Sequence, residues 1–386
     1  MDFVTSCAVP NNGDVLTTAF SADSTILCAG TGDSTVVQYY AQRLFKPSSV
    51  IFNAAMAAGQ EFKLPPVCVR FLPEYLQHRA DEQKGAKNMM LVACVDGGLS
   101  QWHLGSAQRL QSATFHENPI YALDYEPSGT AIAAGCDDGT VVMLDPNRIG
   151  TVVSHLKPEV EWTWTPHGSQ RIQSIKHLTG SLVVSGGWSR TALLWDTRAG
   201  HPVGKMVGPY ICGDGVDAHG EKIVTASFRE ENPLELWDIR NLSEPTSTLL
   251  TVPPVPTADM TRKMSAILLR RDSHHHHPPS PKKTAPDADA AHFEEDVDEV
   301  QRPSLFTAKF NPSGSCLLAG GNFGQLHYYD VNKGIEITER DVHFSRGIAS
   351  AALCTQKHSI FSIAWSPDGR GVGIGGGHGL CLGVTV

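Results

Sequence analysis

The chain has 386 residues and a formal net charge of −9, from 31 basic and 40 acidic side chains. Hydrophobic residues make up 41% of it, enough for a substantial core, and the acidic balance argues against a general nucleic-acid-binding protein. The 36 glycines and 24 prolines, with few helix-like stretches, favour many short strands joined by tight turns.

The first residues, MDFVTSCAVPNNGD, lack the basic start and apolar run of a signal peptide. No apolar stretch reaches the ~18 residues expected of a membrane span. Nine cysteines are present, without a C-x-x-C pair, so buried free thiols in a reducing compartment are the simplest account and a zinc site is the alternative. We therefore expect a cytoplasmic protein without membrane insertion, with nuclear or cytoskeletal association left open.

One pattern then recurs along the chain. A first alternating run ends in an aromatic residue and a turn such as NPSG, a second apolar run ends in glycines or Asp-Gly, and a third ends in an aromatic residue or Asp. The seven copies occupy residues 15–40, 65–104, 119–145, 171–198, a stretch ending at 240, 304–330 and 359–386. A lone strand at residues 3–9 precedes the first copy.

The seventh copy contains Gly371, Gly373 and Gly376 in the spacing G-x-G-x-x-G. A dinucleotide-binding loop needs a helix after it and an acidic residue about 20 positions later. Only seven residues follow Gly379, and they show no helical pattern. The glycines therefore fit the second and third strands of the seventh copy, where they allow tight turns and close approach of backbones.

The repeat resembles that of the WD-repeat family of β-propellers, whose unit is about 40–45 residues. Its most specific motifs are LLWDTR at 193–198, LELWDIR at 234–240 and the Asp-Gly turns. The resemblance implies an all-β, seven-bladed WD40 β-propeller over residues 1–386, in which the N-terminal strand completes the last blade. Residues 253–303 fall between two copies of the repeat and include a low-complexity stretch, so we expect them to form an inserted, largely disordered loop.

The resemblance further implies a set of structural residues. Asp33, Asp96 and Asp138 occupy the turns between second and third strands of blades one to three, and His116 precedes the first strand of copy three. The Trp and Trp-Asp positions are Trp102, Trp195, Asp196, Trp237 and Asp238. Blades four to seven carry other residues in the Asp turn, and Leu144 replaces Trp in copy three.

Those unusual turns lie on the top face of the propeller family, as do the loops that lead into each first strand. Insertions at 151–170, 251–303 and 345–358 fall in such lead-in loops. Trp, Arg and other aromatic residues contribute most of the energy at protein interfaces. We therefore predict a partner-binding patch on the top face, unless these side chains only pack beneath the inserted loops: Trp188, Arg190, Phe228, Arg229 and Phe323.

The insertions hold further candidates. Trp162 and Trp164 are two residues apart and would share one side of a strand, as an exposed anchor or as cover for a blade edge. Residues 257–271 suit a short amphipathic helix, and an acidic block follows at 287–300. His274 to His277 lack fixed metal-binding geometry. Ser280 precedes a proline and has the form of a proline-directed phosphorylation site.

No catalytic motif accompanies these features: GxSxG, HExxH, a Walker loop and an EF-hand loop are all absent. The sequence predicts a non-catalytic scaffold or adaptor that presents top-face loops to other proteins or peptides within a larger assembly, without cofactor or metal. The alternative is a hydrolase-type propeller with an active site at the mouth of the central channel, which a carboxylate or His–Asp pair facing the channel would favour.

Overall fold

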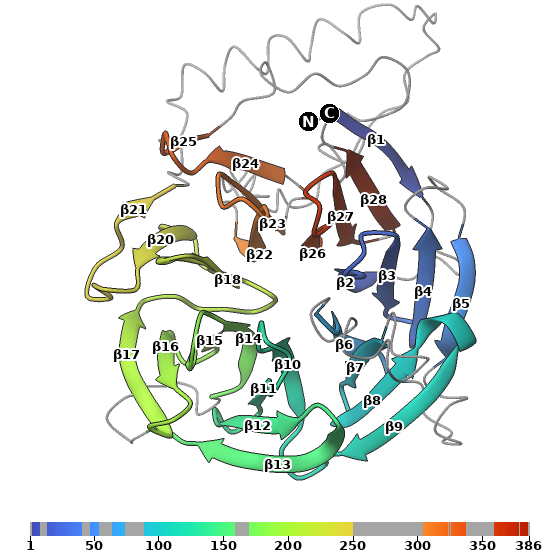
Figure 1. The fold of residues 1–386 in the computed structure, drawn as a ribbon. Coiled ribbons are helices and arrows are strands. Elements are labelled where there is room, and N and C mark those ends of the chain that lie inside the picture. The colour runs from blue at the N-terminus through green and yellow to red at the C-terminus, as the bar shows by residue number, and fades with distance from the viewer. Residues whose placement is uncertain are drawn as a thin grey trace, which may run out of the picture. The chain divides into compact units, whose positions relative to one another are not determined.

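The computed structural model describes residues 2–7, 14–40, 47–53, 64–73, 89–158, 170–249, 304–322, 324, 326–336, 359–377 and 379–384. All of these belong to one compact unit, Met1–Thr251 with Pro303–Val386. Their strands form seven four-stranded antiparallel sheets that stand as blades around a central axis (Figure 1). The predicted all-β, seven-bladed propeller is confirmed. The predicted insertion at 253–303 lies outside the described residues and stays a prediction.

The first three complete blades follow the chain in order. Blade 1 contains β2 (Val15–Phe20), β3 (Ile26–Thr31), β4 (Thr35–Tyr40) and β5 (Pro47–Asn53). Blade 2 contains β6 (Pro66–Phe71), β7 (Met89–Cys94), β8 (Gly98–His103) and β9 (Gln108–Thr114), with a 3-10 turn, η4 (Leu104–Ser106), before β9. Blade 3 contains β10 (Ile120–Tyr125), β11 (Ile132–Cys136), β12 (Val141–Asp145) and β13 (Arg148–Leu156).

The remaining blades keep the same plan. Blade 4 contains β14 (Ile172–His177), β15 (Leu182–Gly187), β16 (Thr191–Asp196) and β17 (His201–Val207). Blade 5 contains β18 (Val216–His219), β19 (Lys222–Ala226), β20 (Leu234–Asp238) and β21 (Ser247–Thr248). Blade 6 contains β22 (Leu305–Phe310), β23 (Cys316–Gly321), β24 (Leu326–Asp330) and β25 (Ile335–Glu336). Blade 7 contains β26 (Ile360–Trp365), β27 (Gly371–Gly376), β28 (Gly379–Val384) and β1 (Asp2–Cys7).

One predicted insertion begins too early. Residues 151–156 belong to β13, where Val152 pairs with Leu144 and Leu156 with Val141. The prediction that the lead-in loop of blade 4 starts at residue 151 was therefore wrong. The stretch alternates between exposed and more buried side chains, as the outermost strand of a blade does when one of its faces packs against the sheet.

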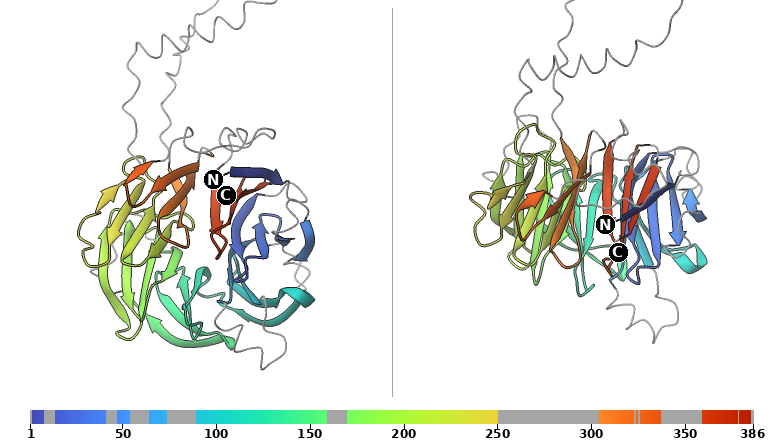
Figure 2. Two further views of the ribbon diagram at one scale, coloured as in Figure 1. Left: turned by 45° about the horizontal axis from the view of Figure 1, so that its top comes forward. Right: turned by 90° about the horizontal axis from the view of Figure 1, so that it is seen from above.

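The ring closes through the two ends of the described chain. In blade 7, Asp2 pairs with Val384 and Cys7 pairs with Leu380. The blue β1 lies beside the red β28 in both orientations (Figures 1 and 2). This pairing confirms that the N-terminal strand completes the last blade, and it gives β28 a hydrogen-bonded neighbour on each side, so that β1 is the outermost strand of blade 7.

Glycines in the second strands let neighbouring blades approach closely. A Cβ atom on Gly375 would lie 2.4 Å from Cγ1 of Val15 in blade 1, and one on Gly373 would lie 2.9 Å from both Cδ atoms of Leu27. A Cβ atom on Gly320 would similarly lie 2.5 Å from Ile360 in the next blade. The glycine-rich tail is thus the second and third strands of blade 7, as predicted, and its glycines make room for side chains of blade 1.

Large third-strand side chains fill the space on the other side of each blade. Trp195 of blade 4 packs with Val141 and Met143 of blade 3. Trp237 of blade 5 packs in the same way with Val184 and Leu194 of blade 4. Burying such side chains contributes about 25 cal/mol per Å² of apolar surface, so blade stacking supplies much of the stability.

Candidate functional site

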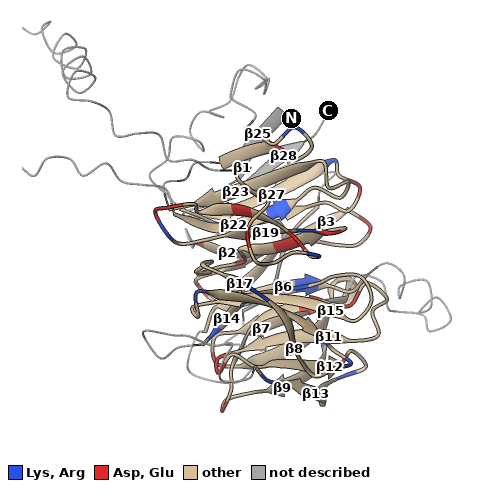
Figure 3. Ribbon diagram, turned by 90° about the vertical axis from the view of Figure 1, so that its left-hand side faces the viewer, with Lys and Arg blue, Asp and Glu red and all other residues tan. Residues whose placement is uncertain are grey.

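The channel carries an ordered set of charged side chains. Charged residues lie in the turns and also within the strands (Figure 3). Five of those in strands share one position of the innermost strands, as their pairing with the second strands shows: Arg70↔Leu91, Asp124↔Ala133, Lys176↔Val184, Asp217↔Val224 and Lys309↔Leu318. Blades 2 to 6 thus carry alternating charges, which we call the charged ring. Blades 7 and 1 have Ala364 and Ala19 at this position.

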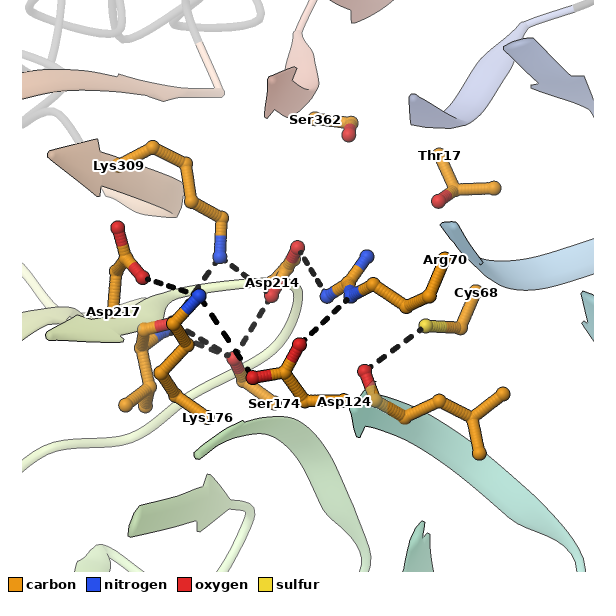
Figure 4. A network of polar contacts seen from close by, with 12 residues as sticks. Thr17, Cys68, Arg70, Asp124, Ser174, Lys176, Asp214, Asp217, Lys309 and Ser362 are labelled. Carbon is orange, nitrogen blue, oxygen red and sulfur yellow. Dashed lines mark hydrogen bonds and ion pairs between the residues drawn. The ribbon is translucent and has the colours of Figure 1, made fainter. Parts of the chain in front are cut away.

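Asp214, in the loop before β18, ties the ring together across the channel (Figure 4). Its carboxylate lies 2.9 Å from Arg70 Nη2 of blade 2 and 2.9 Å from Lys309 Nζ of blade 6. The hydroxyl of Ser174 donates a third hydrogen bond to it, at 3.0 Å. Burial opposes ionisation of Asp214, but Arg70 and Lys309 outweigh this and hold its pKa well below the usual range. The carboxylate is therefore charged, and its oxygens are bound by Arg70, Lys309 and Ser174.

Lys176 is held differently. Its Nζ lies 3.8 Å from Oδ2 of Asp124 and 3.4 Å from Oδ1 of Asp217. Both separations exceed the 2.7–3.2 Å typical of N–H···O hydrogen bonds. The two carboxylates raise the pKa of Lys176, so its ammonium group remains charged. Its side chain is 34% exposed, more than any other member of the charged ring.

The same carboxylates join neighbouring blades. Oδ2 of Asp124 accepts the backbone N–H of His177 in blade 4 at 2.8 Å, and Oδ2 of Asp217 accepts that of Phe310 in blade 6 at 2.9 Å. A serine hydroxyl joins blades 7 and 1 in the same way: Oγ of Ser362 accepts the backbone N–H of Thr18 at 2.9 Å. Buried backbone groups at the blade seams are therefore satisfied by side chains of the preceding blade.

A cavity of about 470 Å³ opens at the charged ring. Its rim includes residues of the turns between first and second strands, so it lies on the bottom face, opposite the turns between second and third strands: Ala22, Pro312 and Pro367. All the acidic and basic members of the charged ring, together with Asp214, line it. Phe71 and Trp365 form part of an apolar wall next to them.

On the top face, the structure places Trp188 in an aromatic and cationic contact that links blades 3 and 4. The guanidinium Cζ of Arg171 lies 4.8 Å from the ring centroid of Trp188 and 4.2 Å from that of Tyr121. Arg171 Nε also donates to Asp137 at 2.6 Å. Trp188 is thus half-buried against its own protein, and only part of its ring is free to meet a partner.

Two further top-face candidates, Phe228 and Arg190, have exposed side chains. Phe228 is 40% exposed and stacks on Phe306, with ring centroids 5.2 Å apart. Phe306 in turn lies 5.6 Å from Phe361, so blades 5, 6 and 7 present an aromatic row of three rings. Arg190 is exposed, in the left-handed region at φ 55°, and its guanidinium lies 5.9 Å from the ring of Tyr210.

Arg229 has an internal role instead. Its Nη2 lies 2.6 Å from Oε2 of the buried Glu235 and donates to the carbonyl of Asn232 at 2.7 Å. Burial raises the pKa of Glu235 despite the nearby guanidinium. This pair braces the turn between β19 and β20. Phe323, the fifth predicted residue, lies outside the described residues, as do Trp162, Trp164 and Ser280.

The predicted structural residues lie in turns and in the core. The carboxylates of Asp33 and Asp138 accept hydrogen bonds from Thr35 and Thr140 at 2.7 and 2.6 Å, that of Asp96 accepts the N–H of Gly98, and the ring of His116 contacts the carbonyl of Asp96. The indole N–H groups of Trp102, Trp195 and Trp237 donate to Ser100, Ser185 and Thr225. Asp196 and Asp238 instead bind the exposed Arg198 and Arg240.

Comparison with known proteins agrees with this geometry. The family model "WD domain, G-beta repeat" matches residues 108–145, which run from the start of β9 to the end of β12. The matched unit is thus the outermost strand of one blade followed by three strands of the next, and the structure repeats this unit around the ring. The chain is a WD40-repeat β-propeller.

Two curated relatives of the WD40 propeller are distant. The spindle assembly checkpoint protein bub3 of Schizosaccharomyces pombe is 28% identical over 161 residues, 41% of this chain and 45% of the relative. The periodic tryptophan protein 2 homolog of Caenorhabditis elegans is 22% identical over 277 residues, 69% of this chain and 29% of the relative. The matched regions therefore span less than half the length of either relative.

Sequence reasoning missed several residues that the WD40 propeller brings together. The charged ring was visible in principle, because aligned copies place Arg70, Asp124, Lys176 and Lys309 at the same position in otherwise apolar runs. Phe306 and Phe361 likewise share the second position of β22 and β26. No sequence signal marks Asp214, because its contacts depend on how a loop enters the channel.

Within the described ranges, no group of three or more His, Cys, Asp or Glu side chains is arranged to hold a metal ion. The same part of the WD40 propeller contains no helix with the length and apolar character needed to cross a membrane.

Proposed function

We propose that this protein is a non-catalytic interaction scaffold or adaptor, whose top face binds other proteins within a multiprotein assembly. The observation that carries the proposal is the aromatic row, which ends in the 40% exposed ring of Phe228. An exposed ring backed by two further rings is held rigidly, so little side-chain entropy is lost when a partner covers it.

Arg190 extends this surface. It is exposed next to Tyr210, whose carbonyl accepts the backbone N–H of Phe228 at 2.8 Å. The proposed contact surface therefore consists of Phe228, Arg190 and the exposed part of Trp188. Arg229 belongs to its support, because it is paired with Glu235. Phe323 remains a candidate member by its sequence position alone.

The test compares three variants in quantitative affinity capture from extracts of the source organism, followed by titration of the captured protein in purified form. We expect Phe228→Ala and Arg190→Ala to weaken the partner's binding by about tenfold or more each, as interface anchors do. Val153→Ala, which alters a 67% exposed side chain on the outer strand β13, is the matched control. Unchanged binding in both top-face variants, with unchanged melting temperature, would contradict the proposal.

A hydrolase is the second candidate, because three carboxylates line the channel cavity: Asp124, Asp214 and Asp217. Their bonding argues for a structural role. Asp214 is held ionised by two cations, whereas a general acid needs a raised pKa. Asp124 and Asp217 each accept a backbone N–H of the next blade. Turnover of chromogenic ester, peptide or phosphate substrates by the protein, abolished in a folded Asp217→Asn variant, would favour the enzyme.

We also propose a cytoplasmic location, with nuclear or cytoskeletal association where a partner recruits the protein. The name of the Schizosaccharomyces pombe relative places that protein in the spindle assembly checkpoint, which is one setting of this kind. No direct contact with nucleic acid is proposed, since the net charge is −9.

A further inference from the structure

The bottom-face cavity exists because the charged ring is incomplete. Blades 2 to 6 place long side chains at the ring position, whereas blades 7 and 1 place Ala364 and Ala19 there. The cavity extends over these two alanines and is walled by the rings of Phe71 and Trp365, both only partly buried. Its volume of about 470 Å³ lies within the 300–1,000 Å³ typical of ligand pockets.

The polar side of the cavity has one group with unused hydrogen-bonding capacity. Among the described residues, Lys176 Nζ has no acceptor closer than 3.4 Å, although an ammonium group carries three donors. Oδ2 of each neighbouring carboxylate accepts a backbone N–H of the following blade, while Oδ1 of Asp217 faces Lys176 at 3.4 Å. The Lys176 side chain is also the most exposed of the ring, so its donors face the cavity.

The charges around the cavity select among ligands. Arg70, Lys176 and Lys309 balance Asp124, Asp214 and Asp217, three against three. A cationic ligand would meet the exposed ammonium of Lys176 first. A phosphate dianion would double its repulsion from the three carboxylates as well as its attraction to the three cations, so it gains nothing net from this balanced set and loses more hydration than a single carboxylate does. A carboxylate presents acceptors to the donors of Lys176 while it adds only one negative charge to the site.

We propose that this cavity binds an acidic side chain of a partner peptide, with the apolar neighbour of that side chain packed between Phe71 and Trp365. The carboxylate accepts hydrogen bonds from Lys176 Nζ, and the apolar group covers Ala19 and Ala364. The site lies on the face opposite the proposed top-face surface, so a single propeller has room for two partner segments at once.

The test uses protein labelled with 5-fluorotryptophan, in which Trp365→Phe assigns the ¹⁹F resonance of the cavity wall. The probes are the capped tripeptides acetyl-Leu-Glu-Leu-amide, its Gln analogue and its Lys analogue. We expect the Glu peptide to shift the Trp365 resonance saturably in the millimolar range. The Gln peptide should bind about tenfold more weakly, since a hydrogen bond to a charged acceptor is roughly twice as strong as one to a neutral acceptor.

Two variants complete the experiment. Ala364→Leu fills the cavity without altering a charge and should abolish the shift, whereas Ala199→Leu, an exposed position in the turn between β16 and β17, should leave it unchanged. Lys176→Met should remove the preference for Glu over Gln. Equal or tighter binding of the Gln or Lys peptide, or no saturable shift with any peptide, overturns the proposal. Capture of top-face partners by Ala364→Leu stays normal in either case, so the two proposals fail separately.

Discussion

At the scale of single residues, Asp214 is notable because its one carboxylate binds side chains from blades that are not neighbours. It binds Arg70 of blade 2, Lys309 of blade 6 and Ser174 of blade 4 from its own position before blade 5. Removing one partner from a buried ion cluster leaves the others uncompensated, which costs more than the pair itself contributes.

We therefore expect Asp214→Asn to lower the free energy of unfolding by about 3 kcal/mol at pH 6, as measured by urea denaturation. The pKa of Asp214 is lower in the folded than in the unfolded protein, so its stabilisation is complete above the unfolded pKa near 4. This stabilisation is lost as the pH falls further, so the difference in unfolding free energy between Asp214→Asn and the parent should narrow at pH 3.

Asp196→Asn is the matched control for that substitution. Asp196 also binds an arginine, but that partner, Arg198, is exposed. An exposed pair in water contributes little, so no measurable change in unfolding is expected. A gap between Asp214→Asn and its parent that stays constant from pH 6 to pH 3 would show that the loss does not come from the charge.

At the scale of elements, the seams between blades depend on small residues at fixed positions of the second strands. β27 of blade 7 contacts blade 1 through Gly373 and Gly375. The sequence places these glycines in the strands of the seventh copy, although their spacing resembles that of a dinucleotide-binding loop. In the structure, the absence of a side chain lets two sheets pack closely.

We expect Gly375→Ala to destabilise the protein by about 1–3 kcal/mol, because overpacking a full core forces its neighbours to move. The added Cβ would lie 2.4 Å from Val15 Cγ1, and Val15 is completely buried. In Gly32→Ala the new Cβ would lie 3.8 Å from its nearest neighbour, so this control should leave the melting temperature nearly unchanged. Equal effects of the two substitutions in thermal denaturation would contradict the packing argument.

At the scale of the whole molecule, ring closure depends on one strand pairing, β1 with β28. We expect deletion of residues 2–7 to lower the melting temperature and to produce dimers or larger species, because β28 would present a free edge. Size-exclusion chromatography with light scattering measures this. A synthetic peptide of residues 1–9, added to the deletion variant, should restore the monomer. A stable monomeric deletion variant without the peptide would show that closure is dispensable.

The fold could be predicted from the sequence because seven copies repeat the same alternation and turn signals, and each copy is one local unit. Local pattern also located the turns that hold Trp188, Arg190 and Phe228. It misjudged residues 151–156, where an edge strand reads like a loop. It also missed the charged ring and Arg229–Glu235, since such contacts arise only when separate repeats or both sides of a turn are brought together.

The pairing of Asp2 with Val384 has a consequence for biosynthesis. Of the described strands, β1 is made before all others, and the strand that it pairs with, β28, is made after all others. Until then the nascent chain holds an unfinished ring, with β1 unpaired and the first blade lacking its neighbour. Ring closure therefore requires that residues 379–384 have been made, and a chain truncated before residue 379 would leave an open, aggregation-prone ring.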